Sequence, residues 1–329
     1  MQTAGPAEVN SPRSSAERPE AIAERPEVIA ERPKVIYVLG VYRSGSTILG
    51  VTLGNCENVF FAGELHSWLT WKGVPRLGGD NGAQLWNSVR EDVKDATELF
   101  GHQTELYVDR SSALRRLHKW PTVRRRLLKR YRALTEDLYR AIAKATGASH
   151  IVDTSHYPLR ALQLKKLDGI DLYLLFLVRD PQGVVASLDP RDTTSGSKPP
   201  LTTNLHLWAT NLLSSLAFLR HPRNRRMFVR HEDFLLDPEG VVRQILDRTG
   251  SCADVPDLTS LKTGYPLHGN RFLREKDVIT LNGPPAARRA PVSRMTTLMQ
   301  LPWAPVLSLM RPAVKPVAAR APGPTSEDR

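Results

Sequence analysis

The sequence predicts an α/β fold with a mostly parallel central sheet flanked by helices. Short apolar runs rich in β-branched residues alternate with longer segments of helical periodicity, which is the order of elements in a parallel sheet covered on both faces. A glycine-rich stretch joins the first apolar run to the first helical segment. The length of 329 residues is ample to bury a core without a disulfide or metal scaffold.

The individual elements follow from these patterns. Strands are expected at the apolar runs, namely residues 35–39, 59–61, 150–153, 172–178 and 226–230. Helices are expected over residues 46–53, 83–100, 111–146, 204–220 and 238–249. Gly54 is expected to end the first helix as a C-terminal glycine cap. Asp237 is expected to cap the last helix, because Pro238 suits its first turn.

The composition divides the chain into a folded domain and two flanking segments. Residues 1–33 contain a seven-residue repeat with Pro19, Pro26 and Pro33, and a proline at this spacing breaks a helix at every second turn. We therefore expect a disordered linker there. The domain is expected over residues 34–282. Residues 283–329, rich in proline, alanine and arginine, are expected to be disordered or loosely docked.

The charge and the cysteine count exclude several classes of protein. Lysine and arginine total 46 against 34 acidic residues, so the net charge of +12 favours anionic partners. Two cysteines are too few for a disulfide-rich secreted domain or a cysteine-based zinc site. The first 30 residues lack an apolar signal region, and no run of about 18 apolar residues occurs. We therefore expect a cytoplasmic protein.

The most informative segment is Gly40–Thr47, which we call the anion loop. It lies between a buried strand and a helix, where backbone amides and the helix N-terminus together bind phosphate-like groups. The spacing is that of a Walker A loop, but Ser46 replaces the lysine and the cation is Arg43. The strand 172–178 ends in Arg179 rather than in a magnesium-binding aspartate. The loop is therefore expected to bind an anion without a metal ion.

A second strand–turn–helix segment, residues 177–187, suggests a second anion site. Arg179 leaves the carboxyl end of its strand, where ligands bind in open α/β sheets. Asp180 and Pro181 suit the first positions of a helix, and Ser187 follows near the second turn. Two such sites suggest a ligand with two separated anionic groups. The alternative is a surface Arg179–Asp180 pair with a serine that packs against the sheet.

These two segments resemble the two signatures of the PAPS-dependent sulfotransferases, PAPS being 3′-phosphoadenosine 5′-phosphosulfate. Further matches are residues 152–155, 230–234 with Pro238, and 269–271. The resemblance covers residues 34–275 and implies a P-loop NTPase-like sulfotransferase architecture, with PAPS as cosubstrate and no metal ion. Two residues depart from the family pattern: His156 stands where many relatives have lysine, and His231 where tyrosine is usual.

The resemblance also implies roles for individual residues. The 5′-phosphosulfate would lie on the anion loop, with Arg43 at the transferring sulfuryl group; the loop residues are Arg43, Ser44, Gly45, Ser46 and Thr47. Arg179 and Ser187 would bind the 3′-phosphate. Arg271, aided by Arg274, would close over that phosphate from a C-terminal loop.

Sulfuryl transfer to a hydroxyl or amine needs a group that accepts the acceptor's proton. Glu64 follows the second strand, so it is expected near the ligand-binding edge and is one candidate for the base. His66 and His156 are rival candidates. A glutamate at such a position is otherwise a solvated loop residue or a helix cap. By analogy with phosphoryl transfer, catalysis would consist mainly of positioning and charge stabilisation around an in-line displacement.

The acceptor and the partners are less well defined by the sequence. Small-molecule, carbohydrate and lipid acceptors all stay open. Residues 110–132 are strongly basic and interleaved with leucines, which indicates either a solvated amphipathic helix or a lid for an acidic or membrane-borne acceptor. The second interpretation would place the protein peripherally at a membrane. No nucleic acid is expected, because no recognised module accompanies the basic segment.

Two other functions remain as hypotheses. A catalytically silent nucleotide-binding adaptor would use the proline-rich ends for partners. A divergent P-loop small-molecule kinase would need magnesium, and Ser46 in place of the Walker lysine argues against it.

Overall fold

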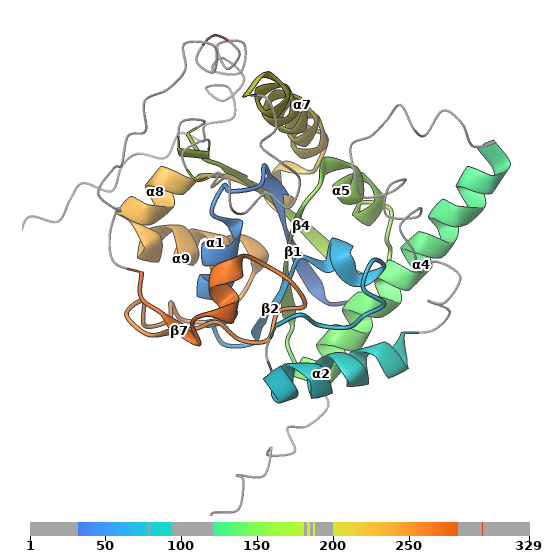
Figure 1. Cartoon of the computed structure of the whole chain (residues 1–329), viewed down its shortest axis with the longest axis horizontal. Coiled ribbons are helices and arrows are strands. Elements are labelled where there is room, and N and C mark those ends of the chain that lie inside the picture. Colours follow the sequence, from blue (N-terminus) through green and yellow to red (C-terminus); the bar gives the residue numbers. More distant parts are fainter. Residues whose placement is uncertain are drawn as a thin grey trace, which may run out of the picture.

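The computed structural model describes residues 32–77, 79–93, 121–180, 183–184, 187, 200–281 and 298. Its central element is a five-stranded sheet in which every neighbouring pair is parallel, in the order β2-β3-β1-β4-β5 (Figure 1). The strands are β1 (Lys34–Gly40), β2 (Val59–Gly63), β3 (His150–His156), β4 (Asp171–Val178) and β5 (Arg226–Arg230). All of them therefore end at the same edge of the sheet, with β1 in the middle.

Helices cover both faces of the sheet (Figure 1). One hydrophobic core joins the sheet to α2 (Gly79–Asp92), α4 (Pro121–Thr146), α5 (Pro158–Leu164) and α7 (Pro200–Leu219). The other joins it to α1 (Ser46–Gly54), α8 (His231–Leu236) and α9 (Pro238–Thr249). Short 3-10 turns occur at η1 (Leu65–Trp68), η4 (Arg223–Arg225) and η5 (Arg271–Arg274). A small antiparallel sheet consists of β6 (Leu261–Lys262) and β7 (Val278–Ile279).

The sequence of β1 explains its central place. Val35, Tyr37 and Leu39 belong to the core on the α4 face, whereas Ile36 and Val38 belong to the core on the α1 face. None of these side chains is more than 1% exposed. Successive side chains of a strand point to opposite faces, so a strand covered on both faces needs a continuous apolar run.

The structure confirms the predicted α/β class and the position of each predicted strand. It also extends some elements and adds others. β3 continues to His156, three residues beyond the predicted end. α2 covers 79–92 rather than 83–100, of which residues 94–100 lie outside the described part. The helices α5 and α8 and the β6–β7 pair were not predicted.

Several sequence predictions fall outside the described residues. The predicted tail 283–329 does so except at residue 298, and the predicted linker 1–33 does so except at residues 32 and 33. The basic stretch 110–120 is also outside, so α4 is described only from Pro121. The domain boundaries drawn from composition therefore stay predictions.

The prediction for Gly54 was right about position and wrong about cause. α1 ends at Gly54, but its C-cap is Asn55, with a right-handed φ of −92°, and Gly54 is not in a left-handed conformation. The glycine is needed for packing instead, because a Cβ there would lie 2.6 Å from the Cβ of Phe61. The Asp237 cap is confirmed, since its Oδ1 accepts a 2.9 Å hydrogen bond from the amide of Gly240.

Candidate active site

The anion loop connects β1 to α1 at the carboxyl edge of the sheet. Gly40 lies so close to β4 that a Cβ would be 2.4 Å from the carbonyl oxygen of Leu177. Gly45, with φ 93°, stands directly before the first turn of α1. The first amides of a helix have no acceptor within the helix. The loop therefore presents donors at the edge of the sheet where ligands bind in α/β proteins.

The hydroxyl groups of the loop are buried rather than solvated. Ser46 and Thr47 are 9% and 7% exposed, and Ser44 is fully buried. Among the described residues, the Ser44 Oγ has no hydrogen-bond partner. An unpaired buried hydroxyl costs about 1–3 kcal/mol, so this atom is suited to bond a ligand that supplies the missing partner.

Arg43, Arg179 and Ser187 come together although 144 residues separate the first from the last. The Arg43 Nε donates a 2.9 Å hydrogen bond to the carbonyl oxygen of Ser187, and its Nη2 contacts the same oxygen. The Nη1 of Arg179 donates in turn to the carbonyl oxygen of Arg43 at 3.1 Å. From the sequence, we expect Arg43 at a separate anion site. The structure instead links the two segments, because Arg43 contacts Ser187 and Arg179 contacts the backbone of Arg43.

The neighbours of Arg179 hold its side chain in place. A Cβ at Gly183 would lie 2.8 Å from the Arg179 Nε, so the glycine leaves room for the arginine. The amide of Asp180 donates to Glu232 Oε1 at 2.9 Å, which fixes the end of β4. The amide of Val184 donates to the carbonyl oxygen of Asp180 at 3.0 Å, as in the first turn of a helix. The described residues 183–184 and 187 therefore have backbone hydrogen bonds of the helical type after β4.

A small hydrophobic cluster lies between the two anion-binding segments. Val41 of the anion loop packs with Val184 and with Leu207 of α7, and Tyr42 lies against them. The ring of Tyr42 is 5.7 Å from that of His206. This apolar contact fixes the distance between the two loops independently of their charges.

The side chain of His231 packs against Gly45 of the anion loop. A Cβ at Gly45 would be only 2.3 Å from the His231 Nδ1, so the glycine is required for the imidazole to fit. The side chain is 5% exposed, and its Nδ1 has no partner among the described residues. Burial, together with the nearby charge of Arg179, lowers the pKa of His231 to about 4. The ring is therefore neutral near pH 7.

The segment 266–274 packs between the start of α1 and the end of β2. A Cβ at Gly269 would be 2.6 Å from Leu273 and 3.7 Å from the Cγ2 of Thr47, so this segment lies against the start of α1. Arg271 begins η5 within the segment. Its side chain lies outside the described part of the chain, and its contact with a 3′-phosphate stays a prediction.

On the other side of the anion loop, Glu64 lies in contact with a histidine that the sequence analysis missed. The Oε2 of Glu64 is 3.1 Å from the Nδ1 of His268. Glu64 occupies the N-cap position of η1 but makes no side-chain cap bond. Burial alone would raise the pKa of Glu64. The hydrogen bond from His268 and the positive potential of His66, His156 and His268 lower it instead, to about 2. Glu64 is thus neither a helix cap nor a solvated loop residue.

The two rival bases, His66 and His156, belong to the same cluster. Their ring centroids are 6.0 Å apart, and both rings contact Tyr157. Burial lowers the pKa of His66 to about 3, and its Nδ1 has no partner among the described residues. His156 has a left-handed φ of 54°, and its Nδ1 is 3.2 Å from the carbonyl oxygen of Thr154. A carbonyl can only accept, so this contact assigns the proton of His156 to Nδ1.

A buried ion pair supports this cluster from below. Asp153, fully buried, is 3.1 Å from the Nη2 of Arg160 and accepts a 2.6 Å hydrogen bond from the hydroxyl of Tyr139. Its other oxygen accepts the amide of Ser155 at 2.9 Å. The Ser155 Oγ accepts the amide of His66 at 2.9 Å. The chain that carries the candidate bases is therefore tied to a rigid internal network.

The order of the strands places these groups in a row along one edge. Glu64 follows β2, His156 ends β3, the anion loop follows β1, Arg179 follows β4, and His231 follows β5. The anion loop thus has candidate proton acceptors on one side and guanidinium groups on the other. This arrangement suits a ligand that is bound by its charges at one end and reacts at the other.

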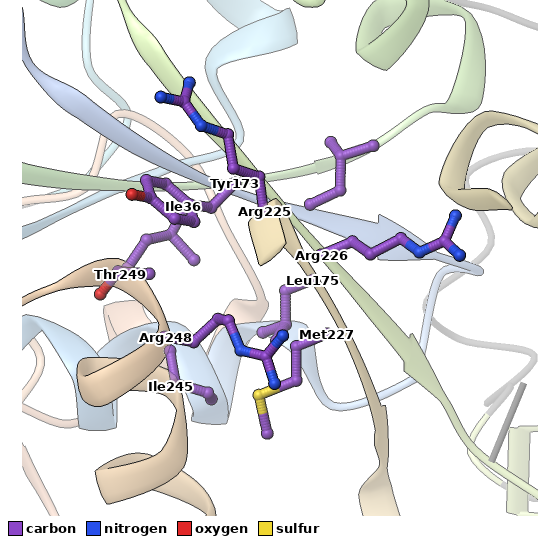
Figure 2. Close-up of a pocket in the computed structure, with 10 residues that line it drawn as sticks. Ile36, Tyr173, Leu175, Arg225, Arg226, Met227, Ile245, Arg248 and Thr249 are labelled. Atoms are coloured by element: carbon purple, nitrogen blue, oxygen red, sulfur yellow. The ribbon is translucent and has the colours of Figure 1, made fainter. Parts of the chain in front are cut away.

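The opposite edge of the sheet has a small hollow that is not part of this site. Its lining includes Arg225, Arg226 and Arg248 together with apolar residues such as Ile36 and Met227 (Figure 2). The three guanidinium groups are already engaged. Arg225 contacts Asp171, Arg226 donates to the carbonyl oxygen of His221, and Arg248 donates to that of Arg223. The arginines that line the hollow therefore have structural contacts within the fold.

The part of the chain that the structure describes lacks two kinds of element. No helix in this part of the chain is both long and apolar enough to cross a bilayer. Nor do the histidine, cysteine and acidic side chains described form a group with the geometry of a metal site.

The comparison with known families decides the identity of the chain. A family model described as the sulfotransferase family matches residues 33–252, which contain β1 to β5 and both anion-binding segments. The chain belongs to the sulfotransferase family. A search of curated proteins finds no match.

Solved structures of sulfotransferases resemble the chain in fold. The sulfotransferase domain from the curacin biosynthetic pathway has a TM-score of 0.50 and 16% sequence identity, over 84% of this chain and 99% of that domain. The sulfotransferase domain from the Synechococcus PCC 7002 olefin synthase has a TM-score of 0.45 and 20% identity, over 83% of this chain and 96% of that domain. The first likeness supports the P-loop-like fold.

Sulfotransferase family membership supports sulfuryl transfer as the general chemistry and makes the protein a transferase. The structure brings the sequence-predicted residues together in two groups. Arg43, Arg179 and Ser187 form one group, and Glu64 and His156 belong to the other. The role of each residue stays a prediction. His268 and Gly183 were missed, because a histidine outside any predicted element and a glycine inside a turn carry no periodic signal.

Proposed function

We propose that this protein transfers the sulfuryl group of PAPS to a hydroxyl or amine of an acceptor. The observation that carries the proposal is the chain of contacts at the P-loop-like anion loop, in which Arg179 donates to the carbonyl oxygen of Arg43 and Arg43 donates to that of Ser187. Two guanidinium groups and a row of helix amides fit a ligand with several anionic groups. Proton acceptors lie on the opposite side of the same loop, where an acceptor hydroxyl would approach.

The residues present fit PAPS as a cosubstrate. The buried Ser44 hydroxyl, which has no partner in the described part of the chain, would hold the 5′-phosphosulfate together with Gly45, Ser46 and Thr47. Arg179 and the Ser187 turn would hold the 3′-phosphate, with Arg271 approaching from η5. When bound, PAPS supplies an activated sulfuryl group. Metal ions are not part of the proposal, because Arg43 and Arg179 would supply the positive charge that balances the ligand.

The contribution of this chain to catalysis is then charge stabilisation and positioning. The loop amides and Arg43 would stabilise negative charge on the sulfuryl and bridging oxygens, and one such donor typically lowers the barrier by about 3 kcal/mol. Arg43 can take this role only if its side chain leaves the Ser187 carbonyl. If the side chain stays there, it would act on the 3′-phosphate instead. The structure of a complex with PAP, the 3′,5′-bisphosphate product, decides between these two.

The test is binding followed by transfer. Calorimetry with PAP in the presence of EDTA should give saturable binding, and Arg179→Ala should weaken it about tenfold to a hundredfold, as expected for a hydrogen bond to a charged group. Arg243→Ala is the matched control, because this arginine pairs with Glu239 on the exposed face of α9. ³⁵S-labelled PAPS with a cell extract should then label an acceptor that gains the mass of SO₃.

Each alternative function predicts a different result in this test. A nucleotide-binding adaptor would bind PAP but transfer no label. A kinase would require magnesium and ATP. Absence of PAP binding, or equal affinity of the Arg179→Ala and wild-type proteins, would contradict the proposal.

The acceptor is a small molecule, a carbohydrate or a lipid headgroup under this proposal, and the labelled product identifies which. Exposed cations on α4, including Arg125, Arg126 and Lys129, would attract an anionic acceptor or an anionic membrane surface. The rate of labelling should then fall steeply with salt. A rate that is insensitive to salt would restrict α4 to a structural role.

A further inference from the structure

Glu64 and His268 form a carboxylate–imidazole pair across the site, although 204 residues separate them in the sequence. An ionised carboxylate can only accept hydrogen bonds, and the pKa of Glu64 is lowered to about 2. The contact between Oε2 and Nδ1 therefore assigns the ring proton of His268 to Nδ1. The Nε2 then carries the lone pair, on the side of the ring away from Glu64.

Backbone contacts fix the two residues relative to each other. The amide of Glu64 donates to the carbonyl oxygen of His268 at 2.9 Å, and the amide of Leu267 donates to that of Ala62 at 3.0 Å. Gly63, with φ 77°, makes this approach possible, because a Cβ there would lie 2.2 Å from the His268 carbonyl oxygen. Glu64 and His268 are therefore paired by the backbone as well as by their side chains.

The His268 ring is held in place and is also accessible. The ring of Trp71 contacts it edge to face, with centroids 4.2 Å apart, and the Arg76 guanidinium stacks on Trp71 at 4.2 Å. The side chain of His268 is 24% exposed and that of Glu64 20%. The next residue, Gly269, lies against Thr47 of the anion loop. The chain next to His268 is thus close to the place where the proposed sulfuryl donor would bind.

We propose that His268 is the catalytic base of the transfer and that Glu64 is its positioning carboxylate. The proposal rests on the proposed function. His268 Nε2 takes the proton of the acceptor hydroxyl while the acceptor oxygen bonds to the sulfuryl sulfur. The bond between that sulfur and the bridging oxygen breaks, and its electron pair leaves with PAP. Glu64 stabilises the imidazolium, which afterwards releases the proton to solvent.

The other candidates in the cluster are less suited to this role. A carboxylate with a pKa of about 2 is a weak base at neutral pH, so Glu64 serves better as a fixed negative charge. His66 is 6% exposed, and burial lowers its pKa to about 3. His156 is 9% exposed and has no carboxylate among its hydrogen-bond partners in the described residues. His268 combines an oriented ring with a side chain that is 24% exposed.

The first experiment observes the ring rather than the reaction. In protein with ¹⁵N-labelled histidine, the signal lost in His268→Gln identifies His268. At pH 8 this signal should show a protonated Nδ1 and a bare Nε2. Glu64→Gln should convert it into a mixture of tautomers, because an amide can donate as well as accept. A ring protonated at Nε2, or one unaffected by Glu64→Gln, would overturn the proposal.

The second experiment measures the total transfer of labelled sulfate from PAPS, to water and to the acceptors of a cell extract together. His268→Gln should lower the rate by about 10²–10⁴-fold, the usual contribution of a general base, with PAP affinity unchanged. Glu64→Gln should lower it less, and the double variant should be no slower than His268→Gln alone, because the two residues act as a unit.

The pH profile separates catalysis from structural support. The charged and titratable groups around the pair are His66, His156, Arg76 and, behind them, Arg160. The transfer rates of the Glu64→Gln and His156→Gln variants should still fall on acidification. The low rate that remains in His268→Gln should no longer depend on pH in this way. If Glu64→Gln or His156→Gln abolishes transfer more completely than His268→Gln, that residue is the base and the proposal is wrong.

The same experiments distinguish this inference from the proposed function. If wild-type protein neither binds PAP nor transfers label from PAPS, the proposed function fails, and the tautomer of His268 still reports on the pair. If wild-type protein does both and His268→Gln transfers at the wild-type rate, only the assignment of the base fails.

Discussion

The two sides of the anion loop are built in different ways. On the β4 side, Arg179 and Ser187 belong to one short segment that follows one strand, and they meet Arg43 from the loop itself. On the β2 side, the candidate proton acceptors come from three separate parts of the chain, represented by Glu64, His156 and His268. We call these the anion-binding side and the proton-transfer side.

This difference has a physical basis. Binding an anion needs amides and cations at a strand end, and one strand–loop–helix unit supplies both. Accepting a proton requires a side chain in one tautomer with an accessible nitrogen, and the neighbours that fix it must come from other elements. The proton-transfer side therefore depends more on tertiary structure, and it rests on a buried ion pair that the anion-binding side lacks among the described residues.

The largest effect is expected from breaking that ion pair. Asp153→Ala leaves Arg160, 3% exposed, without its carboxylate, and should lower the free energy of unfolding by about 3–5 kcal/mol. Asp171→Ala is the control, because the Asp171–Arg225 pair is 29% and 42% exposed and should contribute less than about 1 kcal/mol. Urea denaturation measures both. Similar losses of stability in the two variants would show that the buried network contributes no more to folding than the exposed ion pair.

The second effect concerns His231 under the anion loop. Its pKa is lowered from 6.5 to about 4, so the unfolded chain binds a proton in this range that the folded protein does not. Stability should therefore fall as the pH drops from about 6.5 to 4, with a contribution of roughly 3 kcal/mol from this residue. In His231→Asn, the slope of the free energy of unfolding against pH should decrease by the equivalent of about one proton. Urea denaturation at several pH values measures this slope.

His66 provides the comparison on the proton-transfer side. Its pKa is lowered in the same direction, to about 3, so it contributes a parallel loss that remains in His231→Asn. Below about pH 4.5 the lowered pKa of Glu64 adds a third loss of the same sign. If His231→Asn leaves the pH dependence unchanged, the proton-transfer side alone accounts for the acid sensitivity.

The contrast between the two sides also explains what the sequence could predict. The positions of β1, β4 and the loops after them follow from continuous apolar runs and local glycine and proline patterns. Because parallel strands end at one edge, the placement of Arg43 and Arg179 on the same edge of the sheet followed as well. The contact of Arg43 with the Ser187 carbonyl, and that of Arg179 with the Arg43 carbonyl, did not follow, since rotamers and the register between two loops are set by tertiary packing such as the Val41 cluster.

The proton-transfer side was predictable only in part. Glu64 and His156 could be found because each stands at the end of an apolar run. The place of β3 between β1 and β2, which brings His156 beside the anion loop, is not encoded in any local pattern. His268 lies in irregular chain far from Glu64, and the one local signal was Gly63, whose missing side chain admits the His268 backbone.

The smallest effect is expected at Gly45 and concerns binding rather than folding. Gly45→Ala combines a φ of 93° with a Cβ only 2.3 Å from His231, so the loop amides must shift. Misplacement on this scale should weaken PAP binding about a hundredfold in calorimetry. Gly264→Ala, at φ 67° with no atom within 4 Å of the added Cβ, imposes similar backbone strain and should leave binding unchanged.

A second-site change sharpens the interpretation of the Gly45 variant. His231→Ala in the Gly45→Ala background removes the ring that the new Cβ meets, and it should restore part of the lost PAP affinity. Throughout, the ¹⁵N signals of His268 should keep their wild-type positions, because its contacts with Glu64 and Trp71 lie on the other side of the loop. Movement of those signals in Gly45→Ala would mean that the two sides are mechanically coupled through residues 266–274.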